Sequence, residues 1–271
     1  MSNPETARRF HDLHQGPDIL RLPNAWDAGS ARLIESLGAK AIATTSAGVA
    51  WAHGWPDGDA LPVKMLVASV SEVARVVSIP VSADIEGGYS DHPGEVRNTV
   101  AAVIDAGAVG VNLEDGSEPP ELLSAKIANA RDAALQAGVE LFINARTDVY
   151  LRGLASGPAA LEETVRRARI YADSGADGIF VPGVADPDVI AALAKAIDRP
   201  LNVLARPGLP DAAALQALGV RRLSAGSGIC QSLYGQTRRL TEGFLADGAS
   251  APMSEGAMAY PEINALFAGG G

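Results

Sequence analysis

Short apolar runs rich in β-branched residues alternate with longer alanine-rich stretches along most of this chain. The longer stretches, such as 61–78, 93–106, 159–174, 187–197 and 211–218, have the composition of helices. Eight strands that are each followed by a helix predict a (β/α)8 TIM barrel, and an open doubly wound sheet is the competing arrangement. The apolar runs expected to be strands are 18–23, 40–45, 80–84, 109–113, 140–145, 178–182, 200–205 and 221–225.

The length of 271 residues suits one barrel, because a (β/α)8 domain takes about 250 residues. We expect residues 1–245 to form the barrel. Residues 246–271 form a C-terminal extension, because the chain becomes rich in loop-forming residues after 246. The extension is expected to lie outside the barrel, over one of its faces or over a neighbouring subunit.

Composition narrows the class of partner. Hydrophobic residues make up 47% of the chain and aromatic residues only 5%, which suits branched side chains layered inside a parallel barrel. The net charge of −10 and the lack of a basic stripe argue against a nucleic-acid partner. Residues 166–169 (Arg-Arg-Ala-Arg) fall in a helical pattern and are expected to form a solvated face. An acidic chain that binds an anion needs a metal ion or a well-placed arginine.

No apolar run approaches the ~20 residues that a membrane span needs, so no membrane partner is expected. The polar start of the chain lacks a secretory signal, and a cytoplasmic location follows as the expectation. The single cysteine, Cys230, excludes an internal disulfide and is expected to pack a helix.

Carboxylates gather where the third and fourth expected strands end, with Asp84 and Glu86 after one strand and Glu114 after the next. Function collects at the carboxyl ends of barrel strands, and carboxylates clustered there repel one another unless a cation is bound. Oxygen ligands without histidine favour Mg²⁺ or Mn²⁺ over Zn²⁺. The alternative for each residue alone is a helix cap or an ordinary loop carboxylate.

Arg146 ends the fifth strand and is expected to point into the same opening, as a bidentate clamp for a substrate carboxylate. The alternative is a structural salt bridge to Asp148 or Glu114. Ser46 and the backbone N–H of Ala47 lie in a small turn after the second strand, where a carboxylate can approach closely.

These motifs resemble the isocitrate lyase/phosphoenolpyruvate mutase superfamily. The similarity runs in consistent order over about residues 8 to 245. The segments that carry it are Leu22–Asp27 (LPNAWD), Pro56–Asp59 (PDGD), Asp84–Tyr89 (DIEGGY), Gly110–Asp115 (GVNLED) and Ala145–Asp148 (ARTD).

The resemblance implies a Mg²⁺-dependent enzyme that binds a small 2-oxo-carboxylate and stabilises its enolate. It implies homotetramers that exchange a C-terminal helix, so we expect a homo-oligomer, tetramer or dimer. By position, Asp84 would contact the metal, and Asp57, Glu86 and Glu114 would hold its waters. The residues that would bind the 2-oxo acid are Trp26, Ser46, Ala47, Asp84, Arg146 and Asn202, and those expected to be catalytic are Arg146, Ser46 and Asp57.

One loop departs from the family pattern. Carbon–carbon lyases of this superfamily carry a Lys-Lys/Arg-Cys-Gly-His loop whose Cys acts as acid or base, whereas residues 115–121 here read DGSEPPE. We therefore expect decarboxylation or carbon–carbon cleavage of a 2-oxo-dicarboxylate that needs no such acid. The alternatives are C–P chemistry, as in phosphonopyruvate hydrolase or the mutase, and a non-catalytic 2-oxo-acid binding protein.

Overall fold

The computed structural model describes residues 4–268. The expected ranges 1–245 and 246–271 thus begin and end in residues that lie outside the described part, and the boundary between them stays a prediction. No helix in the described part is long and apolar enough to cross a bilayer.

Nine parallel strands form one sheet in the order β1-β9-β8-β7-β6-β5-β4-β3-β2. The two ends of this order, β1 and β2, are halves of one strand, separated only by Pro23. Since β1 pairs with β9 and β2 pairs with β3, the sheet closes into a TIM-type barrel of eight strand positions, as predicted. The strands are β1 (Leu20–Leu22), β2 (Asn24–Ala25), β3 (Ile42–Thr44), β4 (Val81–Asp84), β5 (Gly110–Glu114), β6 (Phe142–Arg146), β7 (Gly178–Val181), β8 (Leu201–Leu204) and β9 (Arg222–Ser224).

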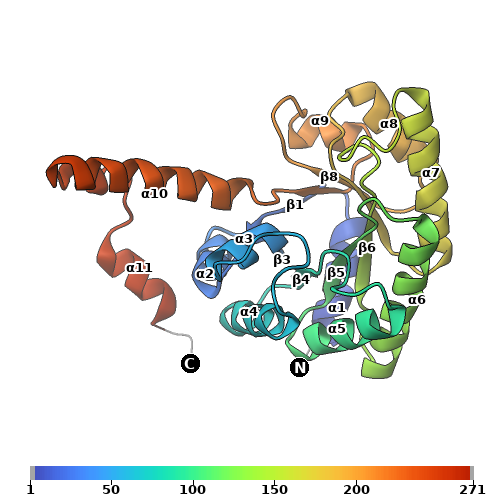
Figure 1. The fold of residues 1–271 in the computed structure, drawn as a ribbon, viewed down its shortest axis with the longest axis horizontal. Helices are drawn as coiled ribbons and strands as arrows, with labels where there is room; N and C mark the ends of the chain where they lie inside the picture. The colour runs from blue at the N-terminus through green and yellow to red at the C-terminus, as the bar shows by residue number, and fades with distance from the viewer. Residues whose placement is uncertain (1–3, 269–271) are drawn as a thin grey trace.

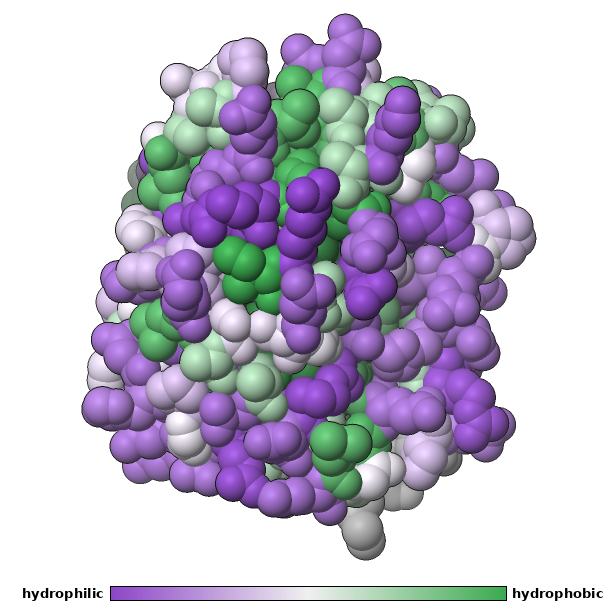
Figure 2. Space-filling model, turned by 90° about the vertical axis from the view of Figure 1, so that its right-hand side faces the viewer, coloured by the Kyte–Doolittle hydropathy of each residue, from purple (hydrophilic) through white to green (hydrophobic). Residues whose placement is uncertain are grey.

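Helices surround the barrel, and the outer face formed by α6 and α7 is mainly hydrophilic (Figures 1 and 2). Proline in the first turn of α5, α6, α7 and α8 suits helix starts, because its missing N–H has no partner there anyway. The helices are α1 (Pro4–Gln15), α2 (Ala28–Ser36), α3 (Ser46–Ala52), α4 (Val63–Val76), α5 (Pro93–Asp105), α6 (Pro120–Ala137), α7 (Pro158–Asp173), α8 (Pro187–Ala196), α9 (Ala212–Ala217), α10 (Gly228–Asp247) and α11 (Tyr260–Phe267), with a 3₁₀ turn at Ala251–Ser254.

The amino-terminal end of the barrel is closed by α1. Phe10 is fully buried and packs edge-on against Phe142 at the start of β6, while the His14 ring stacks on Phe142 at 3.8 Å. Burial lowers the pKa of His14 to about 3, so this imidazole is neutral and serves packing. The open end of the barrel is therefore the carboxyl end.

The end of the chain, from α10 onward, is helical. Figure 1 shows α10 running away from the barrel and α11 turning back toward α2. Arg32 of α2 donates from Nε to the carbonyl oxygen of Leu266 at 2.9 Å, which ties α11 to the barrel. Cys230, near the start of α10, is buried, as expected of a packing residue.

Candidate active site

The carboxyl ends of β4, β5 and β6 lie side by side, which brings the motif residues together. The register places Asp84 opposite Asn112 and Glu114 opposite Arg146. Asp84, Glu114 and Arg146 therefore lie on neighbouring strand ends at one rim of the barrel, as predicted from the sequence.

Asp84 is the residue around which the site is built. Its Oδ2 accepts a hydrogen bond from the backbone N–H of Ser46 at 3.2 Å, at the first turn of α3. Its Oδ1 is buried and has no partner among the described residues. A buried carboxylate oxygen without a partner is costly, so this atom is available for a ligand.

Glu86 is held by the loop that follows α3. Its Oε2 accepts the backbone N–H groups of Gly58 at 2.8 Å and Asp59 at 2.5 Å, and its Oε1 accepts the hydroxyl of Tyr89 at 2.9 Å. Asp57 precedes this turn and is exposed. Burial raises the pKa of both Asp84 and Glu86, and the charge of Asp57 adds to this effect, as expected of a carboxylate near the same rim.

Backbone strain concentrates in these two loops. Within residues 4–268, positive φ at a non-glycine residue occurs only at Asp59 (56°), Glu86 (50°) and Tyr89 (62°). Such conformations cost of the order of 1–3 kcal/mol each and persist where the surroundings fix them. All three positions are linked to one another by the hydrogen bonds of Glu86 and by the bond from Tyr89 N–H to Asp59 Oδ1. The strain thus marks the rim that carries the carboxylates.

Arg146 joins the site to a buried ion network. Its Nη1 lies 2.5 Å from Glu114 Oε2, and its Nε and Nη2 donate to the two oxygens of Asp148 at 2.6 and 3.0 Å. The salt bridges weighed as an alternative role for Arg146 are therefore present. A guanidinium has five N–H donors, so two remain for a ligand, and the clamp stays a prediction.

Asp115 supports this network from the side of α7. Its Oδ1 accepts the backbone N–H of Asp148 at 2.8 Å, and its Oδ2 accepts from Arg167 Nη1 at 2.8 Å and from the Tyr171 hydroxyl at 2.6 Å. Arg167 is buried, so the expectation that the whole run 166–169 is a solvated face is wrong. Arg166, one residue earlier, is half-exposed and pairs with Glu163.

The carboxylates of the rim are hard to ionise. Burial raises the pKa of Asp84 and Glu86, and it raises the pKa of Glu114 to about 8, despite the opposing effect of Arg146. Loss of hydration destabilises the charged forms, and the neighbouring carboxylates add to the effect. Perturbed acids gathered at one opening are typical of functional sites, and a bound cation would restore their charged forms.

Direct ligation of a metal ion by several side chains is not built into this rim. Among residues 4–268, no three His, Cys, Asp or Glu side chains converge closely enough to hold one ion. The arrangement suits an ion that takes one carboxylate directly and reaches the others through water. Mg²⁺ behaves in this way, because it dehydrates reluctantly.

The remaining expected site residues divide into two groups. Trp26 and Ala47 lie beside the rim, where a side chain on Gly48 would come within 2.9 Å of the Trp26 Cβ atom. Gly48 thus permits α3 to pack closely on Trp26. Asn202 is buried inside the barrel, where its Oδ1 accepts from the Ser224 hydroxyl and its Nδ2 has no partner among residues 4–268, so its role in substrate binding stays a prediction.

Two arginines that the sequence did not single out belong to the site's surroundings. Arg222 is fully buried inside the barrel, donates to Asn112 Oδ1 and Ser224 Oγ, and interacts electrostatically with Asp84. Arg152 donates from Nε to Asp148 Oδ2 at 3.0 Å. Neither belongs to a motif, so only the folded structure identifies them.

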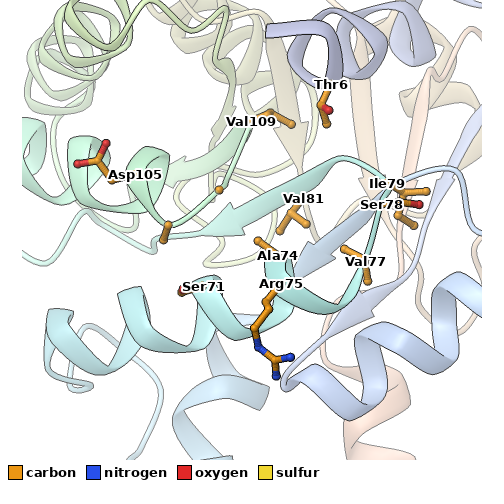
Figure 3. Close-up of a pocket in the computed structure, with 12 residues that line it drawn as sticks. Thr6, Ser71, Ala74, Arg75, Val77, Ser78, Ile79, Val81, Asp105 and Val109 are labelled. Atoms are coloured by element: carbon orange, nitrogen blue, oxygen red, sulfur yellow. The ribbon is translucent and has the colours of Figure 1, made fainter. Parts of the chain in front are cut away.

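A cavity of about 340 Å³ lies at the opposite end of the barrel, beside the starts of β4 and β5 (Figure 3). Its charged side chains are Arg75, on α4, and Asp105, on α5. It holds no cluster of acids, so the carboxyl-end rim is the candidate active site.

Comparison with known proteins agrees with this geometry. Residues 10–245 match the family described as phosphoenolpyruvate phosphomutase. The uncharacterised protein Rv1998c of Mycobacterium tuberculosis is 42% identical over 220 residues, which cover 80% of this chain and 81% of that protein. An oxaloacetate decarboxylase of Pseudomonas fluorescens is 31% identical over 242 residues, covering 84% and 81%. The crystal structure of a putative phosphonomutase from Burkholderia cenocepacia has 40% identity and a TM-score of 0.84, covering 88% of this chain and 99% of that one.

Proposed function

Because the chain belongs to the phosphoenolpyruvate phosphomutase family, we propose that it is a Mg²⁺-dependent lyase acting on a small 2-oxo-dicarboxylate. The observation that carries the proposal is the unpartnered, buried Oδ1 of Asp84, surrounded by carboxylates whose pKa values are raised. Such a group of acids is suited to a divalent cation, and the neighbouring Arg146 and Ser46 are suited to a carboxylate.

The carboxylates of the rim suit a metal ion that one of them contacts directly. Asp84 would hold Mg²⁺, while Asp57, Glu86 and Glu114 would hold its waters. When bound, the ion supplies electrophilic stabilisation of negative charge on the 2-oxo oxygen. Mn²⁺ has the same preference for oxygen ligands and is the alternative ion.

The chain's own groups would bind and orient the substrate. The two N–H donors that remain on Arg146 would bind the carboxylate next to the oxo group, and Asp148 fixes the direction of the guanidinium. The backbone N–H of Ala47 and the hydroxyl of Ser46 would take the remaining oxygen atoms, and Trp26 would shield the pocket from water. These groups stabilise the charge that develops as the bond beside the oxo group breaks.

Decarboxylation is the reaction that needs least from the loop after β5. Residues 116–121 offer Ser117, Glu118 and Glu121 but no Cys, His or Lys. Loss of CO₂ leaves its electron pair on the bound 2-oxo unit and needs no acid for the leaving group. Cleavage of isocitrate requires a base on the hydroxyl and an acid for the departing carbanion. The similarity to an oxaloacetate decarboxylase supports the same choice.

A turnover assay over a panel of oxo acids with Mg²⁺ tests this proposal. We expect measurable decarboxylation of oxaloacetate, little or no cleavage of isocitrate, and competitive inhibition by 2-oxoglutarate. Efficient cleavage of isocitrate or 2-methylisocitrate would contradict the reasoning about the loop. Tight binding without any turnover would instead identify a 2-oxo-acid binding protein.

C–P chemistry is the second candidate, because Arg152 provides a cation beside Gly116, where the sequence shows none. A side chain on Gly116 would lie 3.7 Å from the Arg152 guanidinium carbon. A phosphonate needs such a contact. Release of phosphate from phosphonopyruvate in the same panel would favour this candidate over decarboxylation.

We also propose that α10 packs on a second copy of the chain. An apolar cavity of about 850 Å³ lies over β1 and β9, between α2 and the start of α10. In a regular barrel the last helix would cover this place, but here α10 runs away from it (Figure 1). We call the segment from α10 to α11 the C-terminal arm. Its exposed apolar residues are Ile229, Leu233, Tyr234, Phe244, Leu245, Met253, Tyr260, Ile263 and Phe267.

A further inference from the structure

Arg152, in the loop between β6 and α7, is a cation that its structural contacts do not use up. Its Nε donates to Asp148 Oδ2 at 3.0 Å, and its side chain is 49% exposed. Neither terminal nitrogen, Nη1 or Nη2, has a partner in the described part of the chain. The guanidinium is thus held through Nε, and its two terminal nitrogens remain available for a bidentate contact with an anionic group.

The position of Arg152 relative to Arg146 sets the size of a ligand that could touch both. Arg146 Nη2 and Arg152 Nε each lie 3.0 Å from the same atom, Asp148 Oδ2, so these two nitrogens are at most 6.0 Å apart. In an extended chain of four or five carbons, the terminal carbons are about 4–5 Å apart, from bond lengths of about 1.5 Å. Both of these nitrogens donate to Asp148, so they place the two guanidinium groups within the span of such a dicarboxylate, whose ends would take the donors that Asp148 leaves free.

The space beside Arg152 borders the candidate active site, with which it shares two lining residues. A cavity of about 290 Å³ has Lys126 and Arg152 as its cations. Its acidic lining residues are Glu86 and Glu114 of the rim together with Asp59, Asp91, Asp115 and Glu118, so an anion that enters needs the bound metal ion as well as a cation with free donors. Lys126 is buried, donates to the Gly87 carbonyl at 2.7 Å and lies 3.7 Å from Asp91, so its charge is matched. Arg152, by contrast, is half-exposed and has both terminal nitrogens free among the described residues.

We propose that Arg152 binds the second anionic group of the substrate, the one far from the 2-oxo carboxylate. The inference rests on the proposed function and adds a specificity residue to it. The group is a carboxylate or a phosphonate, since each presents at least two oxygen atoms that can accept parallel hydrogen bonds from a guanidinium. Arg152 thereby makes the site bind dianionic 2-oxo acids more tightly than 2-oxo acids with an apolar tail.

Calorimetric titration with Mg²⁺ present tests this assignment on the full chain. The ligands are 2-oxoglutarate and 2-oxopentanoate, which share a five-carbon chain but differ in the second carboxylate, together with phosphonopyruvate. The variant is Arg152→Gln. The matched control is Arg166→Gln, which removes the same charge from a side chain that is 50% exposed and lies on the outer helix α7.

We expect Arg152→Gln to weaken 2-oxoglutarate binding by about ten-fold or more, the size of a lost charge-assisted hydrogen bond. The affinity for 2-oxopentanoate should stay unchanged, and Arg166→Gln should alter neither. A larger loss for phosphonopyruvate than for 2-oxoglutarate would assign the position to a phosphonate, in support of the proposal.

Two results would overturn it in distinguishable ways. If Arg152→Gln weakens 2-oxoglutarate and 2-oxopentanoate equally, or weakens neither, Arg152 does not read the second anionic group, while the proposed function stands. If the wild-type chain binds none of the three ligands, the proposed function fails and this assignment fails with it.

Discussion

Asp148 offers the sharpest test of whether a buried ion network holds the active site together. Its side chain is 0% exposed and accepts three hydrogen bonds, two from Arg146 and one from Arg152. The substitution Asp148→Asn keeps the shape of the side chain. It removes the negative charge and turns an NH₂ group toward guanidinium N–H groups, which are donors themselves.

The expected cost follows from this burial. Removing one partner of a buried ion pair costs about 3–5 kcal/mol, because the other charge stays buried without compensation. Arg146 keeps a hydrogen-bond acceptor in Glu114 Oε2 at 2.5 Å, so we expect the lower end, about 3 kcal/mol. In a domain of this size each kcal/mol lowers the melting temperature by roughly 2–4 °C, which gives a fall of about 6–12 °C.

Thermal unfolding followed by circular dichroism at pH 7 measures the effect. The control is Asp177→Asn, which makes the same chemical change in an ion pair with Arg131 whose side chains are about a quarter exposed. Solvent screens that pair, so we expect about half the shift or less. Equal shifts in both variants, or a fall below about 2 °C for Asp148→Asn, would refute the argument that burial makes this network costly to break.

Three further predictions concern Mg²⁺ binding, the pH dependence of stability and the packing of the C-terminal arm. Asp84→Ala should abolish Mg²⁺ binding while the barrel stays folded, and calorimetry showing unchanged affinity would reject the metal assignment. Because the folded pKa of Glu114, about 8, lies above its ordinary 4.5, this carboxyl should stabilise the metal-free fold fully below pH 4.5 and lose that contribution as the pH rises through 8. Unfolding midpoints between pH 5 and 8.5 should show this fall, and Glu114→Gln should flatten it. In analytical ultracentrifugation we expect the wild-type chain to sediment as an oligomer and the variant carrying Leu233→Glu and Leu245→Glu to sediment as a monomer, whereas a monomeric wild-type chain would contradict the packing proposed for α10.

The barrel was predictable because its strands are buried on both faces. Parallel strands of this kind read as continuous apolar runs, so all eight runs named from the sequence coincide with observed strands to within a few residues. The break in the first strand follows from Pro23, which lacks the N–H that a ladder needs. The place of the carboxylates was predictable for a related reason, since strand ends in a barrel meet at one rim.

The partners of the charged residues were not predictable in the same way. Arg166 and Arg167 are neighbours in sequence, but successive residues of a helix point about 100° apart, so one faces solvent and the other reaches Asp115. The role of Arg152 depends on a contact between two loops. Which face of its strand Asn202 occupies depends on the pleat, which turns its side chain into the barrel.

The charge balance of the rim predicts an order of binding. Asp57, Asp84, Glu86 and Glu114 gather there, and the nearest cation, Arg146, already contacts two carboxylates. A 2-oxo-dicarboxylate is itself a dianion, and like charges at short range repel strongly in a partly dry site. A divalent cation that neutralises the rim should therefore bind first. We expect 2-oxoglutarate to bind in calorimetry with Mg²⁺ present and to lose detectable affinity in EDTA. Equal affinity with and without the metal would show that the arginines alone suffice to bind the substrate.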